Sequence, residues 1–152
     1  MLRDNINDAL KTAMKAGEAR RVSTLRLVNS ALKNADIEAR GAGKPALGDA
    51  EVLPLLQKMI KQRHESVELY EKGARPELAA QEREEITIIS AYLPRQMTDQ
   101  EIHDTIGALV KEVGASAMKD MGKVMAAIKE RYAGKLDVAK ASAAVKKMLS
   151  GG

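Results

Sequence analysis

Histidine and cysteine are the first side chains to consider for nucleophilic or metal chemistry, and this chain of 152 residues has two histidines and no cysteine. Cysteine nucleophiles and thiolate metal sites are therefore excluded. His64 and Glu65 begin a pattern typical of zinc-binding helices, but Glu68 stands where that pattern needs a second histidine, and His103 lies far along the chain. Because the paired ligands are missing, the sequence predicts no metal site and no cofactor.

Two further patterns favour a structural role over chemistry. The Gly-Ala-Gly-Lys-Pro string at residues 41–45 lacks the spaced first glycine and the Ser/Thr after lysine that a phosphate-binding loop needs, so it is predicted to be a linker. Met118, Met121 and Met125 recur at helical spacing. Flexible thioethers fill irregular aliphatic cores well, so we interpret them as core residues rather than copper ligands.

Glu82 and Glu85 are the carboxylate pair that could act in general acid and base catalysis, because a spacing of three residues puts them on one face of a helix. They lie in the N-terminal half of a predicted helix, where the helix dipole favours negative charge. Arg63 and Arg75 are within reach across a predicted helical hairpin. The sequence favours ion pairing over catalysis here, and no catalytic residue is assigned.

Basic residues give the main functional signal. Arg26 and Lys33, seven apart on one predicted helix, form a cationic ridge that points away from its apolar stripe. Lys119 and Lys123 form a lysine face in a C-terminal segment, residues 116–152, that has eight basic and three acidic residues. The predicted RNA contacts are Arg26, Lys33, Lys119, Lys123, Lys129 and Lys135.

Any RNA contact would have to be made to phosphates and to RNA shape. The chain has no Phe or Trp and only three Tyr, so it offers no aromatic platform on which bases could stack. An ordinary solvated helix face rich in lysine has the same pattern, and this alternative stays open.

Composition indicates a soluble protein with an aliphatic core. Hydrophobic residues make up 45% and charged residues 30% of the chain, and the net charge is +4. Residues 1–47 and 94–152 are basic, whereas residues 48–93 are acidic. The apolar runs are too short for a membrane span and the first residues do not resemble a signal peptide. We expect a cytoplasmic protein.

Apolar residues recur with the 3.6-residue helical period along almost the whole chain, and alternating strand-like runs are missing. The sequence therefore predicts an all-α protein. An N-terminal bundle, residues 1–94, is predicted to contain about four helices, which end near Gly17, before Gly41, at Gly73 and at Leu93. The first carries Met14 on its apolar stripe. Asp49 is the predicted N-cap of the third, and Pro54 leaves open a later start or a kink.

A smaller C-terminal domain of three helices, residues 95–152, is predicted to follow. Residues 98–101 read as a capping box, and helices are expected over residues 99–113, 118–132 and 137–149. Residues 94–97 offer little apolar surface, so the domain is predicted to move relative to the bundle. Gly122 is predicted to permit a close helix approach, with the alternative that its helix starts nearby and the glycine belongs to the first turn. Val138 is predicted to lie on the apolar stripe of the last helix.

The order of these elements and several local motifs resemble the YqeY-like proteins, which are free-standing relatives of the helical tail of the GatB subunit of tRNA-dependent amidotransferases. The resemblance spans essentially the whole chain. It is carried by Arg26-Leu27-Val28 and Lys33, Gln62-Arg63-His64-Glu65-Ser66 and Tyr70, Gly73-Ala74-Arg75, Glu82 and Glu85, Tyr92-Leu93-Pro94, and Gly134-Lys135-Leu136-Asp137. The most specific string is Asp120-Met121-Gly122-Lys123-Val124-Met125. The chain departs from the family at Val138, where glycine is common.

The resemblance implies a bacterial, two-part helical protein connected with glutamine-dependent amide transfer to tRNA. In the full GatB subunit the chemistry belongs to a separate domain and a partner amidase, whereas the tail is thought to contact tRNA. This chain is all tail, and it has no Gly-Gly-Ser-Ser run that would mark an amidase nucleophile. Catalysis by the chain alone is therefore not expected.

Three functions stay open. The first, which we favour, is a non-catalytic tRNA-binding or accessory module that works with an amidotransferase or an aminoacyl-tRNA synthetase component. The second is an enzyme, or the accessory subunit of one, in carbon-nitrogen ligation with glutamine as amido donor. The third is a protein-interaction domain without RNA binding.

Overall fold

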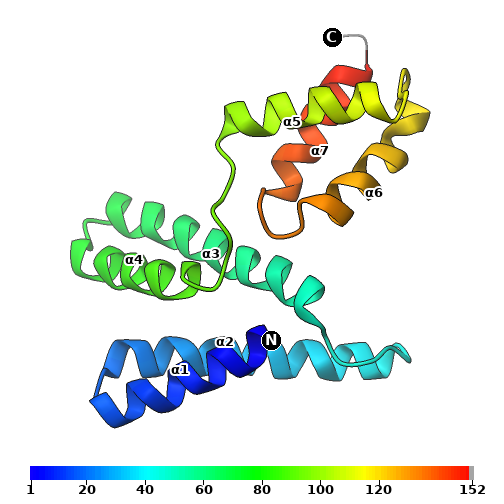
Figure 1. The fold of residues 1–152 in the computed structure, drawn as a ribbon. Helices are drawn as coiled ribbons and strands as arrows, with labels where there is room; N and C mark the ends of the chain where they lie inside the picture. Colours follow the sequence, from blue (N-terminus) through cyan, green and yellow to red (C-terminus); the bar gives the residue numbers. More distant parts are fainter. Residues whose placement is uncertain (151–152) are drawn as a thin grey trace. The chain divides into compact units, whose positions relative to one another are not determined.

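The computed structural model describes residues 1–150, and it confirms the predicted all-α class: these residues form seven α-helices and one 3₁₀-helix, with no strand. Figure 1 shows the fold. The chain divides into two compact units, Met1–Leu93 and Pro94–Gly152. Within the described residues, no helix is long and apolar enough to cross a membrane.

The N-terminal unit packs its helices in pairs. It contains α1 (Leu2–Ala16), α2 (Ala19–Gly41), α3 (Asp49–Lys72) and α4 (Pro76–Ser90). In Figure 1, α1 lies along α2 and α4 lies along α3, and α2 also packs against α4. The buried core is aliphatic, as expected, and comprises Ile6, Leu25, Val28, Leu32, Val52, Leu56, Met59 and Ile89. Met14 is 52% exposed, so the prediction that it lies on the buried apolar stripe of α1 is wrong.

Asp49 stabilises a helix other than the one it begins. Its carboxylate accepts a hydrogen bond from the Leu2 backbone N–H at 3.1 Å, which satisfies an otherwise free donor at the start of α1. The residue before α3 is Gly48, whose N–H donates to Glu51 at 2.7 Å. The predicted N-cap role of Asp49 is therefore wrong, and so is the alternative of a start after Pro54, which lies inside α3.

The turn between α3 and α4 places an alanine in a conformation that favours glycine. Ala74 has φ of 56°, and the Arg75 N–H donates to the Tyr70 carbonyl at 2.8 Å, which closes the C-terminus of α3. In this left-handed region, the Cβ of an L-residue comes too close to the following carbonyl oxygen and destabilises the conformation. Glycine has no Cβ and avoids this contact.

We expect Ala74→Gly to raise the free energy of unfolding by about 0.5–1 kcal/mol, because relief of the left-handed strain outweighs the added chain entropy. Urea titration followed by circular dichroism measures the change. Ala42, at the end of α2, has φ of −91°, so Ala42→Gly is the matched control and should not stabilise. Equal effects of the two variants would contradict the role given to backbone strain.

The C-terminal unit encloses its own core. It contains α5 (Asp99–Glu112), a 3₁₀-helix, η1 (Met118–Asp120), α6 (Met121–Arg131) and α7 (Val138–Leu149). The buried residues are Ile102, Ile106, Leu109, Val124, Ile128, Leu136, Ala141, Val145 and Leu149. The predicted capping box is confirmed, since the Thr98 hydroxyl accepts from the Glu101 N–H at 3.2 Å and the Glu101 carboxylate accepts from the Thr98 N–H at 3.3 Å.

Three details of this unit differ from expectation. The predicted single helix over 118–132 is wrong at its start, because residues 118–120 form the 3₁₀-helix. Val138 is 40% exposed and Met118 is 41% exposed, so neither is a core residue. A Cβ added at Gly122 would meet no atom within 4 Å, so the predicted close helix approach is wrong. The alternative is confirmed, because α6 begins at Met121 and Gly122 lies in its first turn.

The segment before α5 is tied to the C-terminal unit. The Gln96 side chain donates to the Gly134 carbonyl at 2.6 Å, the Met97 N–H donates to the Lys135 carbonyl at 2.7 Å, and the Met97 side chain packs against the core. The apolar surface of Met97 is therefore used within the C-terminal unit, and the expectation that residues 94–97 offer little of it to fix the angle to the bundle stays a prediction. Motion of the unit relative to the bundle stays a prediction.

Candidate functional site

All six predicted RNA contacts are exposed side chains, and none forms an ion pair within residues 1–150. The arginines of the chain behave differently. Seven of the ten are held by carboxylates: Arg3, Arg20, Arg21, Arg63, Arg83, Arg95 and Arg131. Within residues 1–150, the six predicted contacts are thus among the exposed cations that the fold leaves available for an outside anion, whereas the exposed Lys140 is paired with Asp99 at 3.0 Å.

The lysine face is built around Asp120. Lys119 lies in η1 and Lys123 in the first turn of α6, and both charges act on the Asp120 carboxylate between them. That carboxylate accepts hydrogen bonds from the Ser116 and Ala117 N–H groups at 3.0 and 3.3 Å. These backbone bonds are the main reason why the pKa of Asp120 is lowered. Asp120 is therefore ionised at neutral pH, where it fixes the turn that positions the two lysines and offsets one of their charges.

Lys129 and Lys135 do not extend the lysine face as one stripe. Lys129 lies in the last turn of α6, six residues after Lys123, which turns it by about 120° around the helix. Lys135 lies between α6 and α7. The four predicted contact lysines of this unit therefore present separate charges rather than one stripe.

The cationic ridge lies on α2, opposite the buried residues Leu25, Val28 and Leu32. Its predicted direction is confirmed, because Arg26 and Lys33 are both exposed.

Sequence reasoning missed three neighbours of the ridge. Arg40 is exposed, continues the seven-residue spacing and forms no ion pair within the described chain. Leu27 and Ile37 are 49% and 60% exposed on the same side. The repeat of Arg26, Lys33 and Arg40 every seven residues was the signal that could have found Arg40.

The carboxylate pair forms part of an ion-paired cluster between α3 and α4. The Arg63 Nε lies 3.0 Å from the Glu85 carboxylate, and its Nη1 donates to the Met59 carbonyl at 3.1 Å. The paired side chains are only 13% and 16% exposed. Burial and the neighbouring Glu85 raise the pKa of Glu82. Ion pairing of Glu85 is confirmed, and its partner is Arg63 rather than Arg75.

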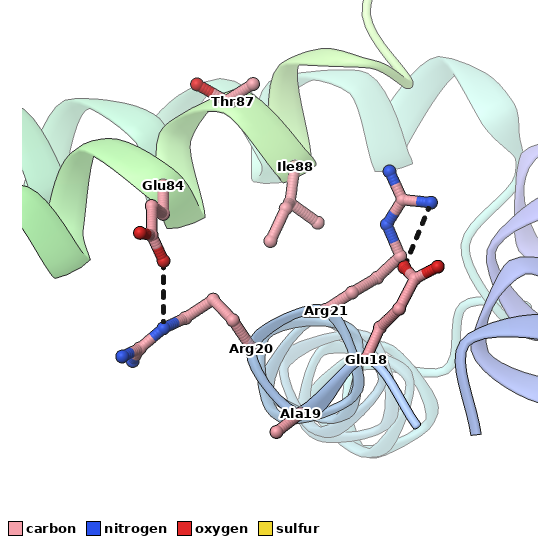
Figure 2. Close-up of a pocket in the computed structure, with 7 residues that line it drawn as sticks. All are labelled: Glu18, Ala19, Arg20, Arg21, Glu84, Thr87 and Ile88. Carbon is pink, nitrogen blue, oxygen red and sulfur yellow. Dashed lines mark ion pairs between the residues drawn. The ribbon is translucent and has the colours of Figure 1, made fainter. Parts of the chain in front are cut away.

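A groove of about 490 Å³ lies between the start of α2 and the second half of α4 (Figure 2). Its lining residues are Glu18, Ala19, Arg20, Arg21, Glu84, Thr87 and Ile88. The Arg20 Nε lies 3.2 Å from the Glu84 carboxylate, and Arg21 Nη1 lies 3.6 Å from that of Glu18. Both guanidinium groups are paired with carboxylates of the lining, which includes no imidazole, and the Thr87 hydroxyl donates to the Arg83 carbonyl at 3.1 Å. It was not foreseen, since its two walls are distant in sequence.

Metal chemistry has no support in the described residues. Among residues 1–150, no group of three or more His, Asp or Glu side chains could hold a metal ion. The paired carboxylates serve Arg63, and the candidate site that the geometry supports is the set of unpaired cations.

Comparisons with known proteins cover most of the chain. The family model for Yqey-like protein matches residues 3–149. The chain is 33% identical over 114 residues to "Altered inheritance of mitochondria protein 41, mitochondrial" of Lachancea thermotolerans, which covers 74% of this chain and 59% of that protein. It is 29% identical to the protein of the same name in Vanderwaltozyma polyspora, over 74% of this chain and 62% of that protein.

A Schizosaccharomyces pombe protein is 30% identical over 62% of this chain and 73% of its own length. The match spans about three fifths of the first two relatives. All three are yeast proteins, so they give no support to the expectation of a bacterial source.

Proposed function

Because this chain belongs to the family of YqeY-like proteins, we propose that it is a non-catalytic helical module that binds tRNA through phosphate contacts made by its C-terminal unit. The observation that carries the proposal is the contrast between the seven arginines that carboxylates hold and the four lysines of the C-terminal unit that the sequence assigns to RNA. Lys119, Lys123, Lys129 and Lys135 are exposed and make no ion pair within residues 1–150. An ammonium group that no carboxylate holds can release counterions from RNA when it meets a phosphate.

The proposed contacts would recognise the phosphate charge and the shape of the tRNA rather than its base sequence. The chain has no Phe or Trp for base stacking, and lysine lacks the planar fork with which arginine recognises guanine. Affinity is therefore expected to depend strongly on salt and weakly on the tRNA species. Arg26 and Lys33, which the sequence also assigns to RNA, lie on a surface of different character because Leu27 and Ile37 are exposed beside them.

The proposal does not require a single compartment. The sequence led us to expect a cytoplasmic protein, and two relatives are named as mitochondrial. Cytoplasm and mitochondria both contain tRNA. In either compartment, we propose that the protein acts together with an amidotransferase or with an aminoacyl-tRNA synthetase component.

The double variant Lys119→Glu, Lys123→Glu tests the lysine face. Each lost phosphate contact should lower the magnitude of the slope of log K against log salt by about one, so we expect a fall of about two and weaker binding of all tRNAs alike. Filter binding of total tRNA to the full chain at several salt concentrations measures the slope.

The matched control is Lys58→Glu with Lys61→Glu, because these exposed lysines of α3 also lack ion pairs in the described residues. Circular dichroism should show unchanged helicity in both variants. A slope that changes equally in both variants, or in neither, would remove the lysine face from the proposal.

A further inference from the structure

The side of α2 that faces away from the bundle is a continuous exposed surface, here called the outer face. It consists of a central seam, Ser23, Leu27, Ser30, Asn34, Ile37 and Gly41, and a basic flank, Arg26, Lys33 and Arg40. All nine residues are exposed, whereas Thr24, Leu25, Val28 and Leu32 are buried on the opposite side. In Figure 1, α1 lies along α2.

The seam has the spacing of a coiled-coil interface. Successive residues of the seam are separated alternately by four and by three positions, which is the a/d spacing of a heptad repeat. None of the six carries a charge, and the two large apolar ones, Leu27 and Ile37, are 49% and 60% exposed. Asn34 occupies an a-type position, where a single asparagine fixes the register of paired helices.

The basic flank stands where a coiled coil places its partner-selecting charges. Arg26, Lys33 and Arg40 each precede an a-type residue, so they occupy g positions, which form ion pairs with the facing helix. None of the three forms an ion pair within residues 1–150, although seven other arginines do, and the charge of Arg40 acts on the nearby Asp36, which Arg3 holds. One edge of the face thus carries three exposed positive charges at a constant interval.

We propose that the outer face of α2 binds one acidic amphipathic helix of a partner protein, with apolar residues against Leu27 and Ile37 and Glu or Asp against the basic flank. Charge complementarity selects this occupant. Binding falls with salt because three ion pairs at a surface are screened. The affinity is modest, since only two large apolar side chains are available to be buried.

A second copy of this chain fits the face less well. Antiparallel pairing of two α2 helices would set the basic flank of one against the basic flank of the other. Parallel pairing would set it against Thr24, Ala31 and Glu38, of which Thr24 is buried and Ala31 is partly buried. RNA would use only the cations of the flank and would leave the uncharged seam, including Ile37, in water.

The probe for the test is a fluorescent 28-residue helical peptide with Leu and Ile on its heptad seam, one matching Asn, and Glu on both flanks. Repulsion between the glutamates keeps the peptide monomeric at neutral pH. A second peptide carries Lys in place of every flanking Glu. Fluorescence anisotropy with the full chain is expected to show at least tenfold tighter binding of the Glu peptide.

Two variants separate the seam from the flank. Leu27→Gln with Ile37→Gln should weaken the Glu peptide at least tenfold, while Arg26→Glu with Lys33→Glu and Arg40→Glu should reverse the preference in favour of the Lys peptide. Lys58→Glu with Lys61→Glu, a charge reversal on α3, is the matched control and should leave the preference unchanged. The changed positions of α2 are all exposed, so the fold should tolerate them.

Equal binding of the two peptides by the wild-type chain would overturn the proposal. A wild-type dimer in sedimentation equilibrium that Ile37→Gln dissociates would identify a second copy as the occupant and would also overturn it. If the flank variant loses tRNA binding and the seam variant does not, while no peptide binds, the outer face is a phosphate ridge. None of these outcomes depends on Lys119 and Lys123, so failure here is distinct from failure of the proposed function.

Discussion

Replacing Ile106 by alanine is expected to lower the free energy of unfolding of the C-terminal unit by about 2–4 kcal/mol and to leave that of the N-terminal unit unchanged. Ile106 is completely buried in the core that α5, α6 and α7 share. Removing its outer carbons costs their transfer free energy and leaves a cavity that the neighbours fill only in part. A unit of this size has only a few kcal/mol of stability, so much of it would unfold near room temperature.

The matched control is Ile89→Ala, because Ile89 is equally buried in the core of the N-terminal unit. Hydrogen exchange of backbone amides, resolved by residue, measures each unit separately. Ile106→Ala should raise exchange only in helices after Pro94, and Ile89→Ala only in helices before it. If either variant raised exchange equally throughout, the two compact units would fold as one cooperative domain.

Replacing Arg63 by methionine is expected to lower the free energy of unfolding by about 2–3 kcal/mol at pH 7. The substitution keeps much of the aliphatic stem but leaves Glu85, a side chain only 16% exposed, without its cation. Breaking a largely buried pair from one side is costly because the remaining charge stays poorly hydrated. Arg83→Met is the matched control: its pair with Glu71 is more than half exposed on both sides, so the loss should be below about 0.5 kcal/mol.

The loss of unfolding free energy caused by Arg63→Met should become smaller as the pH falls toward 4. The pKa of Glu82 already lies above its usual 4.5, because of burial and then repulsion by Glu85, while the charge of Arg63 acts to lower it. A raised carboxyl pKa means that the folded state holds the proton more tightly than the unfolded chain. The free energy of unfolding therefore falls as the pH rises from about 4.5 through the pKa of Glu82 in the folded state. The fall is larger in Arg63→Met, because the charge that lowers this pKa is missing. A loss that is the same at pH 4 and pH 7 would contradict the electrostatic explanation.

Local patterns predicted most of the fold because they report short-range physics. Gly17 ends α1 with φ of 71°, and the Thr98 capping box begins α5, as the sequence indicated. The errors arise where tertiary contacts decide. Asp49 caps α1 across 47 residues of sequence, and Asp120 bonds back to residues 116 and 117, which favours a 3₁₀ turn over a longer helix.

The candidate site was predictable only in part. Helical phase placed Arg26, Lys33 and the lysine face on exposed surfaces, because the apolar stripe determines which side is buried. Which cations are free was not predictable, since pairs such as Arg20 with Glu84 form between helices that are distant in sequence. The groove of Figure 2 was missed for the same reason, since its walls belong to α2 and α4.

The most direct test of the proposed function is the salt dependence of tRNA binding by the unmodified full chain. Filter binding of total tRNA should be compared at about 50 mM and 200 mM salt, where several phosphate contacts change affinity by orders of magnitude. We expect binding at low salt with a slope of log K against log salt of about −3 to −4, because the four lysines proposed to contact phosphates, Lys119, Lys123, Lys129 and Lys135, provide about 0.7–0.9 each. No measurable binding at the lower salt concentration would contradict the proposed RNA-binding function.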